Sequence, residues 1–589
     1  MNNNEAIILR SAERTGQDEY ITRILDFFGV PWRSLTAREF LDIAYNKQTG
    51  TSFSLLGSAD CLMQLLAAPE GRVEQLWRTR VHSAFVYASP DPAALQILAQ
   101  KLTQNPRAAI QAFDPSSREL FISDKSRELC GIMSGLRISL PKNVGGTGFL
   151  FTTSLPQNAI ELTSVGRLTT FLKIVYNGVS VHLSTSPEIV DISAEMKGRN
   201  FDVREHVLSA VPIVLYVNWA FAKTCWRAPE ANACLVIDDL LLKPSYGFVD
   251  YQELLNLMEC HRFSTNIAFI PWNWRRSDPK VVRLFKSHPD KYSLSIHGCD
   301  HIAAEFGIHD RQRLSWKARQ AVERMSGHES KTGLRHDRIM VFPQGVFSAA
   351  AMGVLKDTNF TAAVNTEVIS TDPKPPAIRI CDVWDVAVMS YASFPIFTRR
   401  YPSQGIENFA FDLLLGKPCI VVTHHDFFGD GYKQLVDFIT GLNALAVPLS
   451  WRSLGDVVSR SCRQRELASQ KMAIEMYGTV LRVENHSDQQ KQFLIRKREP
   501  TPSAIKEILA DSRLIAWNSS GDYIDFKIEL NGGQNTTIAI NYLDLTGNGQ
   551  SRDDVSYRAK TMVRRYLCEA RDNYVMRSKV LSRVAGFLK

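Results

Sequence analysis

Short apolar runs alternate with segments of helical periodicity through the middle of the chain, from about residue 230 to residue 465. The runs occupy residues 233–237, 266–270, 292–296, 339–342, 360–364 and 419–423. Between them, segments such as 251–260 and 312–325 carry apolar residues at the spacing of an amphipathic helix. Because repeated strand-then-helix units place successive strands parallel, this region is predicted to form a parallel sheet or a (β/α) barrel.

Carboxylates and imidazoles follow three of these runs directly. They are Asp238 and Asp239 after the first run, His297 and His301 after the third, and His424 and His425 after the last. The carboxyl ends of barrel strands meet at one rim, where catalytic side chains lie, so the pattern predicts one site built from three strand ends. The alternatives are that the aspartates cap the next element and that the histidines are hydrogen-bonded surface residues.

His297 and His301 are separated by three residues, a spacing that places both on one face of a helical turn. Two such imidazoles and a carboxylate from another strand can bind one metal ion and leave positions open for water. This ligand set is typical of a catalytic metal site. His424 and His425 are expected to point to opposite sides if their strand continues, so only one of them can face the site.

Three motifs in this region resemble the polysaccharide deacetylases of the NodB-homology family. Ile237-Asp238-Asp239, His297-x-x-x-His301 and Val422-Thr423-His424 are similar to the first, second and last motifs of that family, in the same order and each after an apolar run. The resemblance covers about residues 230 to 465. It implies an irregular (β/α) barrel that removes acetyl groups from N-acetylated sugars with a divalent metal ion.

The resemblance also implies roles for single residues. Asp239, His297 and His301 are expected to bind the metal, with Asp238 as the general base and His424 as the general acid. The metal is expected to be Zn²⁺, with Co²⁺, Mn²⁺ or Ni²⁺ as alternatives.

Two motifs of the family are altered in this chain. Where the third motif has an Arg that orients the base, this chain has Val341 before Phe342-Pro343, and Arg338, Arg399 or Arg400 are candidates to replace it. The fourth motif is matched only in part, at residues 382–385, where Asp385 is expected to support the site. The alternative for that segment is a loop anchored by a buried Trp.

Further side chains near the strand ends are candidates to contact a substrate, because aromatic rings stack on sugars and Arg binds anions. The candidates are Tyr246, Trp272, Trp274, Arg275, Pro343, Arg399 and His425. Glu305, four residues after His301, is expected to orient an imidazole. The alternatives are a simple turn at Tyr246, packing of the Trp pair against a loop, and a solvated Glu305.

The flanking regions predict two more units. Residues 1–195 alternate strand and helix patterns, typical of a flavodoxin-like or amidotransferase-like α/β domain, and residues 196–229 read as a helical connector. Residues 470–589 predict a β-sandwich-like module that ends in a basic helix. That helix is expected to dock through one apolar face while its basic residues face water. The apolar face consists of Val563, Tyr566, Leu567, Ala570 and Tyr574.

Composition narrows the function classes. A net charge of +8 is small for 589 residues, and we expect no nucleic-acid partner. The ten cysteines contain no C-x-x-C pair, which argues against a disulfide framework or a zinc knuckle. The N-terminus lacks a secretory pattern, and the apolar stretch 207–222 is too short for a membrane span. We therefore expect a cytoplasmic protein of undetermined oligomeric state.

The combined prediction is an α/β protein with a deacetylase-type barrel that hydrolyses N-acetyl groups, a linear amide bond, on a sugar or polysaccharide intermediate. Two alternatives stay open. One is a metal-dependent hydrolase of another amide or ester, and the other is a catalytically weak glycan-binding or scaffolding protein in polysaccharide production.

Overall fold

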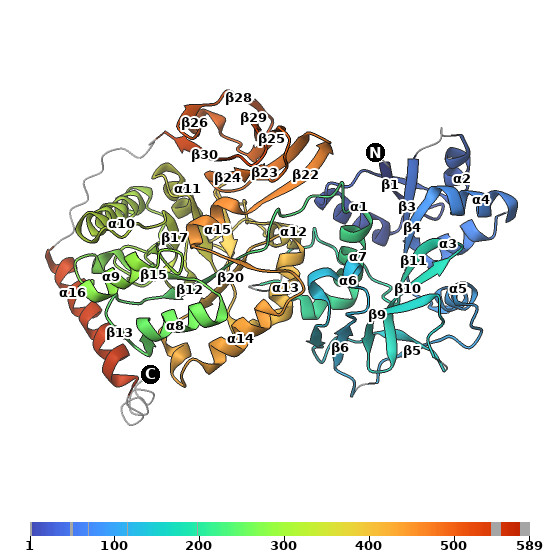
Figure 1. The fold of residues 1–589 in the computed structure, drawn as a ribbon, viewed down its shortest axis with the longest axis horizontal. Helices are drawn as coiled ribbons and strands as arrows, with labels where there is room; N and C mark the ends of the chain where they lie inside the picture. Colours follow the sequence, from blue (N-terminus) through green and yellow to red (C-terminus); the bar gives the residue numbers. More distant parts are fainter. Residues whose placement is uncertain are drawn as a thin grey trace.

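A computed structural model describes residues 3–46, 51–68, 70–114, 116–152, 154–196, 198, 200–543 and 555–577. It has mixed α/β architecture, with a parallel barrel, a large N-terminal mixed sheet and a C-terminal pair of β-sheets (Figure 1). This arrangement confirms the fold class predicted from the sequence.

Parallel strands form the central barrel, in the order β19-β18-β17-β16-β15-β12-β20. They are β12 (Asn232–Asp238), β15 (Thr265–Phe269), β16 (Tyr292–His297), β17 (Ile339–Val341), β18 (Ala362–Asn365), β19 (Ile396–Thr398) and β20 (Cys419–Thr423). Every residue of β12 is buried, as expected of an apolar strand covered on both faces. Strand β19 was not among the apolar runs predicted as strands, because it has only three residues and follows Pro395.

The barrel closes irregularly between β19 and β20, through Arg400. The backbone N–H of Arg400 donates to the Ile420 carbonyl at 3.0 Å, and its carbonyl accepts from the Val422 N–H at 2.9 Å. One residue thus replaces a regular strand pairing at this edge.

Helices alternate with the barrel strands. They are α8 (Tyr251–His261), α9 (Pro279–Ser287), α10 (Arg311–Thr332), α11 (Ala349–Asp357), α12 (Ile380–Trp384), α13 (Ile406–Leu414), α14 (Lys433–Asn443) and α15 (Leu454–Arg460). The longest, α10, begins after Asp310, whose side chain caps the Arg313 N–H, and ends at Gly333 with φ of +75°. Both ends of α10 are therefore set by local sequence.

The N-terminal sheet combines parallel and antiparallel halves. Its parallel half has the order β2-β1-β3-β4-β11, and the antiparallel half continues as β10-β9-β6-β7, with β8 pairing with β10 and β5 pairing with β8. The strands are β1 (Asn3–Leu9), β2 (Trp32–Leu35), β3 (Thr51–Ser58), β4 (Val81–Tyr87), β5 (Ala109–Ala112), β6 (Glu119–Ile122), β7 (Arg137–Ser139), β8 (Thr147–Leu150), β9 (Ala159–Val165), β10 (Leu168–Tyr176) and β11 (Val179–Ser184). The helices are α1 (Gly16–Phe27), α2 (Ala37–Asn46), α3 (Ala59–Leu66), α4 (Glu70–Arg80), α5 (Ala93–Thr103) and α6 (Arg127–Cys130). The antiparallel half departs from a purely flavodoxin-like pattern.

Helix α7 (Val203–Ala220) joins the N-terminal sheet to the barrel as a core element. Its first turns carry polar residues, but residues 210–217 are buried on all sides, so neighbours must cover this part of the helix completely. Its buried residues belong to one hydrophobic core that contains side chains from both the N-terminal region and the barrel. The segment predicted as a connector therefore packs the two units together.

The C-terminal sheets stack around their own apolar core. One sheet has the order β22-β23-β25-β29-β28 and the other β24-β30-β26-β27. The strands are β22 (Cys462–Ala468), β23 (Lys471–Met476), β24 (Val480–Glu484), β25 (Lys491–Arg498), β26 (Ile505–Ala510), β27 (Arg513–Leu514), β28 (Trp517–Ser520), β29 (Tyr523–Leu530) and β30 (Asn535–Tyr542). The pairing is antiparallel except between β23 and β25.

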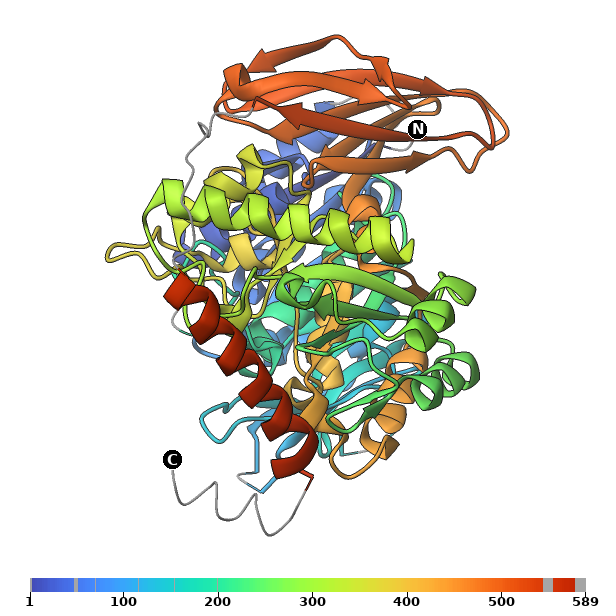
Figure 2. The same ribbon diagram turned by 90° about the vertical axis from the view of Figure 1, so that its left-hand side faces the viewer.

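Helix α16 (Val555–Ala570) and the π-turn 571–575 lie across the barrel (Figure 2). Their buried residues are Thr561, Arg565 and Asp572. The residues predicted to dock the helix are exposed instead, including Val563 at 55% and Leu567 at 64%. The prediction was wrong because the barrel surface here is polar: Lys243 and Arg276 both pair with Glu569.

Within the described ranges, no helix is both long enough and apolar enough to cross a membrane.

A buried charge cluster joins the C-terminal sheets to the barrel, and Glu499 is its centre. Glu499 accepts hydrogen bonds from Lys356 Nζ at 2.7 Å and from the Tyr542 hydroxyl at 2.9 Å.

Glu499→Gln leaves the buried Lys356 without its counter-charge, so we expect the free energy of unfolding to fall by about 3–5 kcal/mol. Urea unfolding measures this loss. The control Asp525→Asn breaks the exposed pair with Arg496 and should cost below about 1 kcal/mol. Equal losses in the two variants would contradict the prediction.

Candidate active site and metal centre

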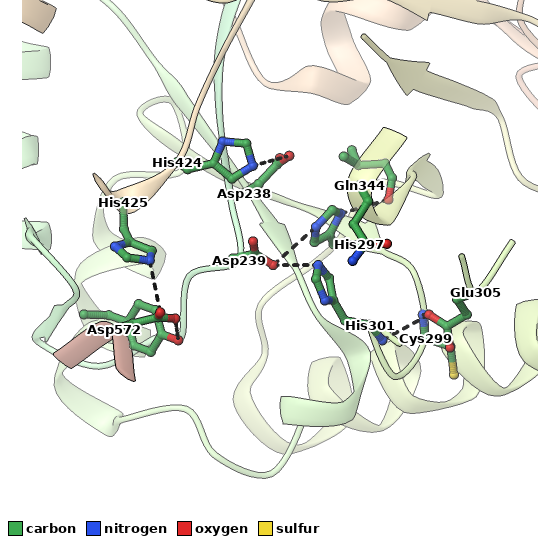
Figure 3. A network of polar contacts seen from close by, with 12 residues as sticks. Asp238, Asp239, His297, Cys299, His301, Glu305, Gln344, His424, His425 and Asp572 are labelled. Carbon is green, nitrogen blue, oxygen red and sulfur yellow. Dashed lines mark hydrogen bonds and ion pairs between the residues drawn. The ribbon is translucent and has the colours of Figure 1, made fainter. Parts of the chain in front are cut away.

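Three barrel strands deliver the predicted site residues to one rim (Figure 3). Strand β12 ends at Asp238, β16 ends at His297, and β20 ends one residue before His424. Asp239 follows β12 with φ of +72°, a left-handed conformation that turns its carboxylate toward His297. The side chains expected to act together therefore lie together.

Asp239, His297 and His301 form a compact cluster. Asp239 Oδ1 lies 2.8 Å from His301 Nε2 and 3.4 Å from His297 Nε2. His297 Nδ1 lies 2.9 Å from the Val341 carbonyl, so Nδ1 carries the proton and Nε2 presents a lone pair. Burial raises the pKa of Asp239, but the two imidazoles outweigh burial and hold that pKa well below its usual value.

This cluster fits a divalent metal ion. Asp239 Oδ1 is buried, and apart from the two imidazole nitrogens it has no hydrogen-bond partner among the described residues. Two imidazole nitrogens and one carboxylate oxygen within 4.8 Å of one another are the donor set of a catalytic zinc-type site. The structure thus brings together the residues predicted as ligands.

The segment between the two histidines is a loop, not the predicted helical turn. Gly298 has φ of +63° and His301 has φ of +55°. A Cβ atom at Gly298 would lie 2.5 Å from Pro343 Cγ, so this position requires glycine. Pro343, predicted to contact substrate, is instead buried against this loop.

Glu305 holds this loop through its backbone. Its carboxylate accepts from the N–H groups of Cys299 at 2.9 Å, Asp300 at 2.9 Å and His301 at 3.0 Å. Glu305 is buried, so no water competes for these bonds. The predicted supporting role has a different geometry from the one expected: Glu305 fixes the main chain that carries His301, not an imidazole.

A second acidic cluster lies behind the loop. Cys299, Asp300 and Glu305 also lie within reach of a common ion. Asp300, however, pairs with Lys317 and with Arg324 at 2.6 Å, and accepts from the Tyr557 hydroxyl of α16 at 2.7 Å. Burial raises the pKa of Asp300, but Arg324 and Lys317 hold it below its usual value. Its charge is already neutralised by side chains of the protein.

Asp238 is clamped by Arg399. Two guanidinium nitrogens of Arg399 donate to the two carboxylate oxygens of Asp238, each at 2.7 Å, and both side chains are buried. Burial raises the pKa of Asp238, while Arg399, His297 and His424 lower it to a net value below the usual one. Arg399 was predicted to contact substrate, but its burial leaves it facing Asp238. Arg399 thus places next to Asp238 the guanidinium group that Val341, in the position of the third-motif Arg, does not have.

His424 lies on the open side of Asp238. Its Nε2 is 3.8 Å from Asp238 Oδ2, and its ring stacks on Tyr401 with centroids 6.0 Å apart. The side chain is 36% exposed, so a substrate can reach it. His424 faces the predicted base, as expected from its motif.

His425 points away from Asp238, toward the C-terminal turn. Its Nε2 lies 3.5 Å from Asp572 Oδ1, and the Tyr246 hydroxyl donates to Asp572 Oδ2 at 2.8 Å. Burial, with the nearby Asp572, raises the pKa of Tyr246. Tyr246 and His425 are both buried, which contradicts their predicted contact with substrate. Asp572 was missed because it is 326 residues from Tyr246, and no motif marks it.

The remaining candidates lie around α16 and α10. Trp272 packs edge-on against Tyr566 of α16, with centroids 6.2 Å apart. Trp274 packs over Gly327 of α10, and exposed Arg275 stacks on it at 4.3 Å. Both tryptophans therefore have packing contacts, but with helices and not with the loop that the alternative expected.

Asp385 lies outside the site. Its carboxylate accepts from the Tyr477 hydroxyl and lies 3.3 Å from Arg463, both in the C-terminal region. The predicted support of the site by Asp385 is wrong, because the altered fourth motif turns this side chain toward the C-terminal sheets. Trp384 is buried, in agreement with the alternative of a Trp-anchored loop.

The Glu305 contacts generate a prediction about metal binding. Glu305→Gln replaces an acceptor oxygen by an NH₂ group that faces backbone N–H groups, so the loop carrying His301 should loosen. We expect zinc affinity to fall about 10- to 100-fold. Isothermal titration calorimetry measures this change. The control Glu323→Gln alters an exposed residue of α10 and should leave the affinity unchanged. An unchanged affinity in Glu305→Gln would contradict the positioning role.

Comparisons with known proteins find matches among solved structures, all at low sequence identity, but no sequence family. No protein-family model and no curated protein match this chain. Agd3, described as a novel carbohydrate deacetylase, is 10% identical with a TM-score of 0.49, over 92% of this chain and 98% of that chain. The T48 deacetylase is 13% identical with a TM-score of 0.24, over 40% of this chain and 94% of that chain. A family 4 carbohydrate esterase from Streptomyces lividans is 13% identical with a TM-score of 0.21, over 36% of this chain and 86% of that chain.

The strand order and the position of each motif come from this chain itself. Asp238-Asp239, His297 to His301 and His424 follow parallel strands of one barrel and converge on one rim. These features confirm the resemblance to the polysaccharide deacetylases, and the central unit is an irregular (β/α) barrel of deacetylase type.

Proposed function

We propose that this chain is a metal-dependent hydrolase that removes N-acetyl groups from a sugar or polysaccharide intermediate. The observation that carries the proposal is the juxtaposition of two sets of groups. Asp239, His297 and His301 can hold a cation, and the adjacent Asp238 and His424 can accept and donate a proton. Hydrolysis of an amide needs all of these functions in one place.

Asp239, His297 and His301 would hold the metal. When bound there, a divalent ion supplies Lewis-acid activation of water and of the acyl carbonyl. The lone pair of His297 Nε2 is kept available by the Nδ1 contact with Val341, and the loop held by Glu305 carries His301.

Asp238 acts as the general base. It adjoins the ligand Asp239 in sequence, and the two-point contact with Arg399 fixes its carboxylate plane. Asp238 accepts the proton of the water that attacks the acyl carbon. The ionised form that this step needs is favoured by the positive charge of Arg399.

His424 acts as the general acid. When the carbon–nitrogen bond breaks, the amine must gain a proton, and exposed His424 is placed to give it. Stacking on Tyr401 limits the orientation of the imidazole. The products are acetate and a free amine, and the proton taken by Asp238 balances the proton given by His424.

The presence of Arg399 argues against a scaffolding role. That alternative was based on the missing third-motif Arg, and Arg399 provides a guanidinium at the base from another strand. The acyl substrate itself is inferred from the motif resemblance, so product analysis decides between an N-acetyl sugar and another amide or ester.

The separate roles of the metal ligands and of the general base predict two classes of variant. His297→Ala or His301→Ala should lose metal and activity together, whereas Asp238→Asn should keep the metal and lose at least about 100-fold in kcat. Elemental analysis and acetate release from N-acetylated oligosaccharides measure the two properties. The control His486→Ala removes a histidine that is 82% exposed on the C-terminal sheets and should change neither. Metal loss in Asp238→Asn equal to that in His297→Ala would refute the assignment.

The Arg399 clamp predicts a further kinetic signature. Arg399→Met should keep the metal but lower kcat about 100-fold or more with little change in KM, because Asp238 loses its orientation. Arg399→Lys should recover part of kcat, since Lys restores charge but not the two-point contact. Arg338→Gln, at an exposed position that was another of the three sequence candidates, is the control. If Arg338→Gln impaired kcat and Arg399→Met did not, the role given to Arg399 would be wrong. Thermal unfolding of each variant separates misfolding from loss of catalysis.

A further inference from the structure

Helix α16 docks on the barrel mainly by its polar face, and within the described residues its apolar face is largely exposed, although Tyr566 also packs against Trp272. The exposed apolar side chains are Val555, Met562, Val563, Tyr566, Leu567 and Tyr574, each 48–80% exposed. A terminal helix of a globular protein normally buries its apolar face. Here the buried positions are Thr561, Arg565 and Asp572.

The exposed residues form one stripe. Residues 555, 559, 563, 566, 570 and 574 follow one another at intervals of three or four, so they share one face of the helix. Sixteen helical residues extend for about 24 Å. Single exposed apolar residues are ordinary, but a continuous stripe of this length marks an interaction surface.

The contacts on the inner face hold the stripe outward. Glu569 pairs with Lys243 and Arg276, and Asp572 accepts from Tyr246. The Asn573 side chain accepts from the Gly247 N–H at 2.9 Å. These contacts are directional, so the helix needs no rotation to present its apolar face.

The charges beside the stripe are basic. Lys560, Arg564 and Arg571 lie along one edge of the helix, and Arg571 is 59% exposed although it also contacts Asp572. The acidic residues of the described segment, Glu569 and Asp572, both turn inward to partners on the barrel. The outer surface of α16 is therefore apolar with a cationic border.

We propose that α16 binds the surface of an anionic lipid bilayer and lies in the plane of the interface. An apolar stripe with a basic border is the composition of helices that insert one face at the headgroup boundary. Tyr574, which is 72% exposed, suits this depth because it has an apolar ring and a polar hydroxyl. Charge complementarity favours anionic lipid over a second copy of this chain, whose own stripe carries the same basic border.

Binding in this orientation would place the catalytic rim beside the bilayer. Tyr246 and Gly247 contact the inner face of the C-terminal turn, and the same loop follows Asp239 in the chain. The lipid surface would thus adjoin the mouth of the candidate site. The inference does not depend on the proposed reaction.

Co-sedimentation of the full-length protein with vesicles tests the proposal. Wild type should bind vesicles of phosphatidylcholine mixed with phosphatidylglycerol more tightly than vesicles of phosphatidylcholine alone. Val563→Gln/Leu567→Gln should weaken binding about tenfold or more, since two apolar side chains no longer enter the interface. Lys560→Gln should weaken binding about fivefold, only on the anionic vesicles. The control Leu514→Gln changes a residue that is 74% exposed on β27 and should have no effect.

Three outcomes would overturn the proposal. The first is no binding to anionic vesicles, and the second is equal binding by wild type and Val563→Gln/Leu567→Gln. The third is self-association in light scattering that this double variant abolishes while vesicles are not bound, because a second copy would then cover the stripe. A chain that binds vesicles through α16 but releases no acetate would refute the proposed function and support this inference.

Discussion

The segment that follows β19 holds the barrel and the site together. Arg400 joins β19 to β20 through its backbone, and its guanidinium pairs with Asp412 of α13. Arg399, the preceding residue, points to the other side and clamps Asp238 at the end of β12. Barrel closure and orientation of the predicted base therefore depend on two adjacent residues, one facing out and one facing in.

Burial makes these interactions strong and also obligatory. A buried carboxylate without a partner is costly, so Asp238 needs Arg399 to remain ionised inside the barrel. The same reasoning applies to the loop that carries His301, where the buried carboxylate of Glu305 is satisfied by three backbone N–H groups. Around the candidate metal centre, the His297 ring and the loop that carries His301 are thus oriented by hydrogen bonds with buried neighbours. Asp239 Oδ1 has no such hydrogen bond, and that atom is where a cation fits.

Much of the barrel and the centre of the site could be predicted from sequence, because both depend on local patterns. Apolar runs fix the strands, and polar residues just after a run lie at the carboxyl end of a strand. Contacts between distant segments leave no such pattern. Nothing near Asp238 indicates which of several arginines reaches it, and nothing near Tyr246 indicates Asp572. The orientation of α16 was mispredicted for a related reason: its apolar periodicity is real, but the surface that receives it is charged.

The central claim is that Asp239, His297 and His301 bind the metal, rather than the neighbouring Cys299, Asp300 and Glu305. X-ray absorption at the zinc edge of the zinc-loaded full-length protein tests this claim most directly. Binding at the strand ends predicts only nitrogen and oxygen at about 2.0–2.1 Å, with the outer-shell signature of two imidazoles. A sulfur neighbour at about 2.3 Å would place the ion on Cys299 and contradict the claim.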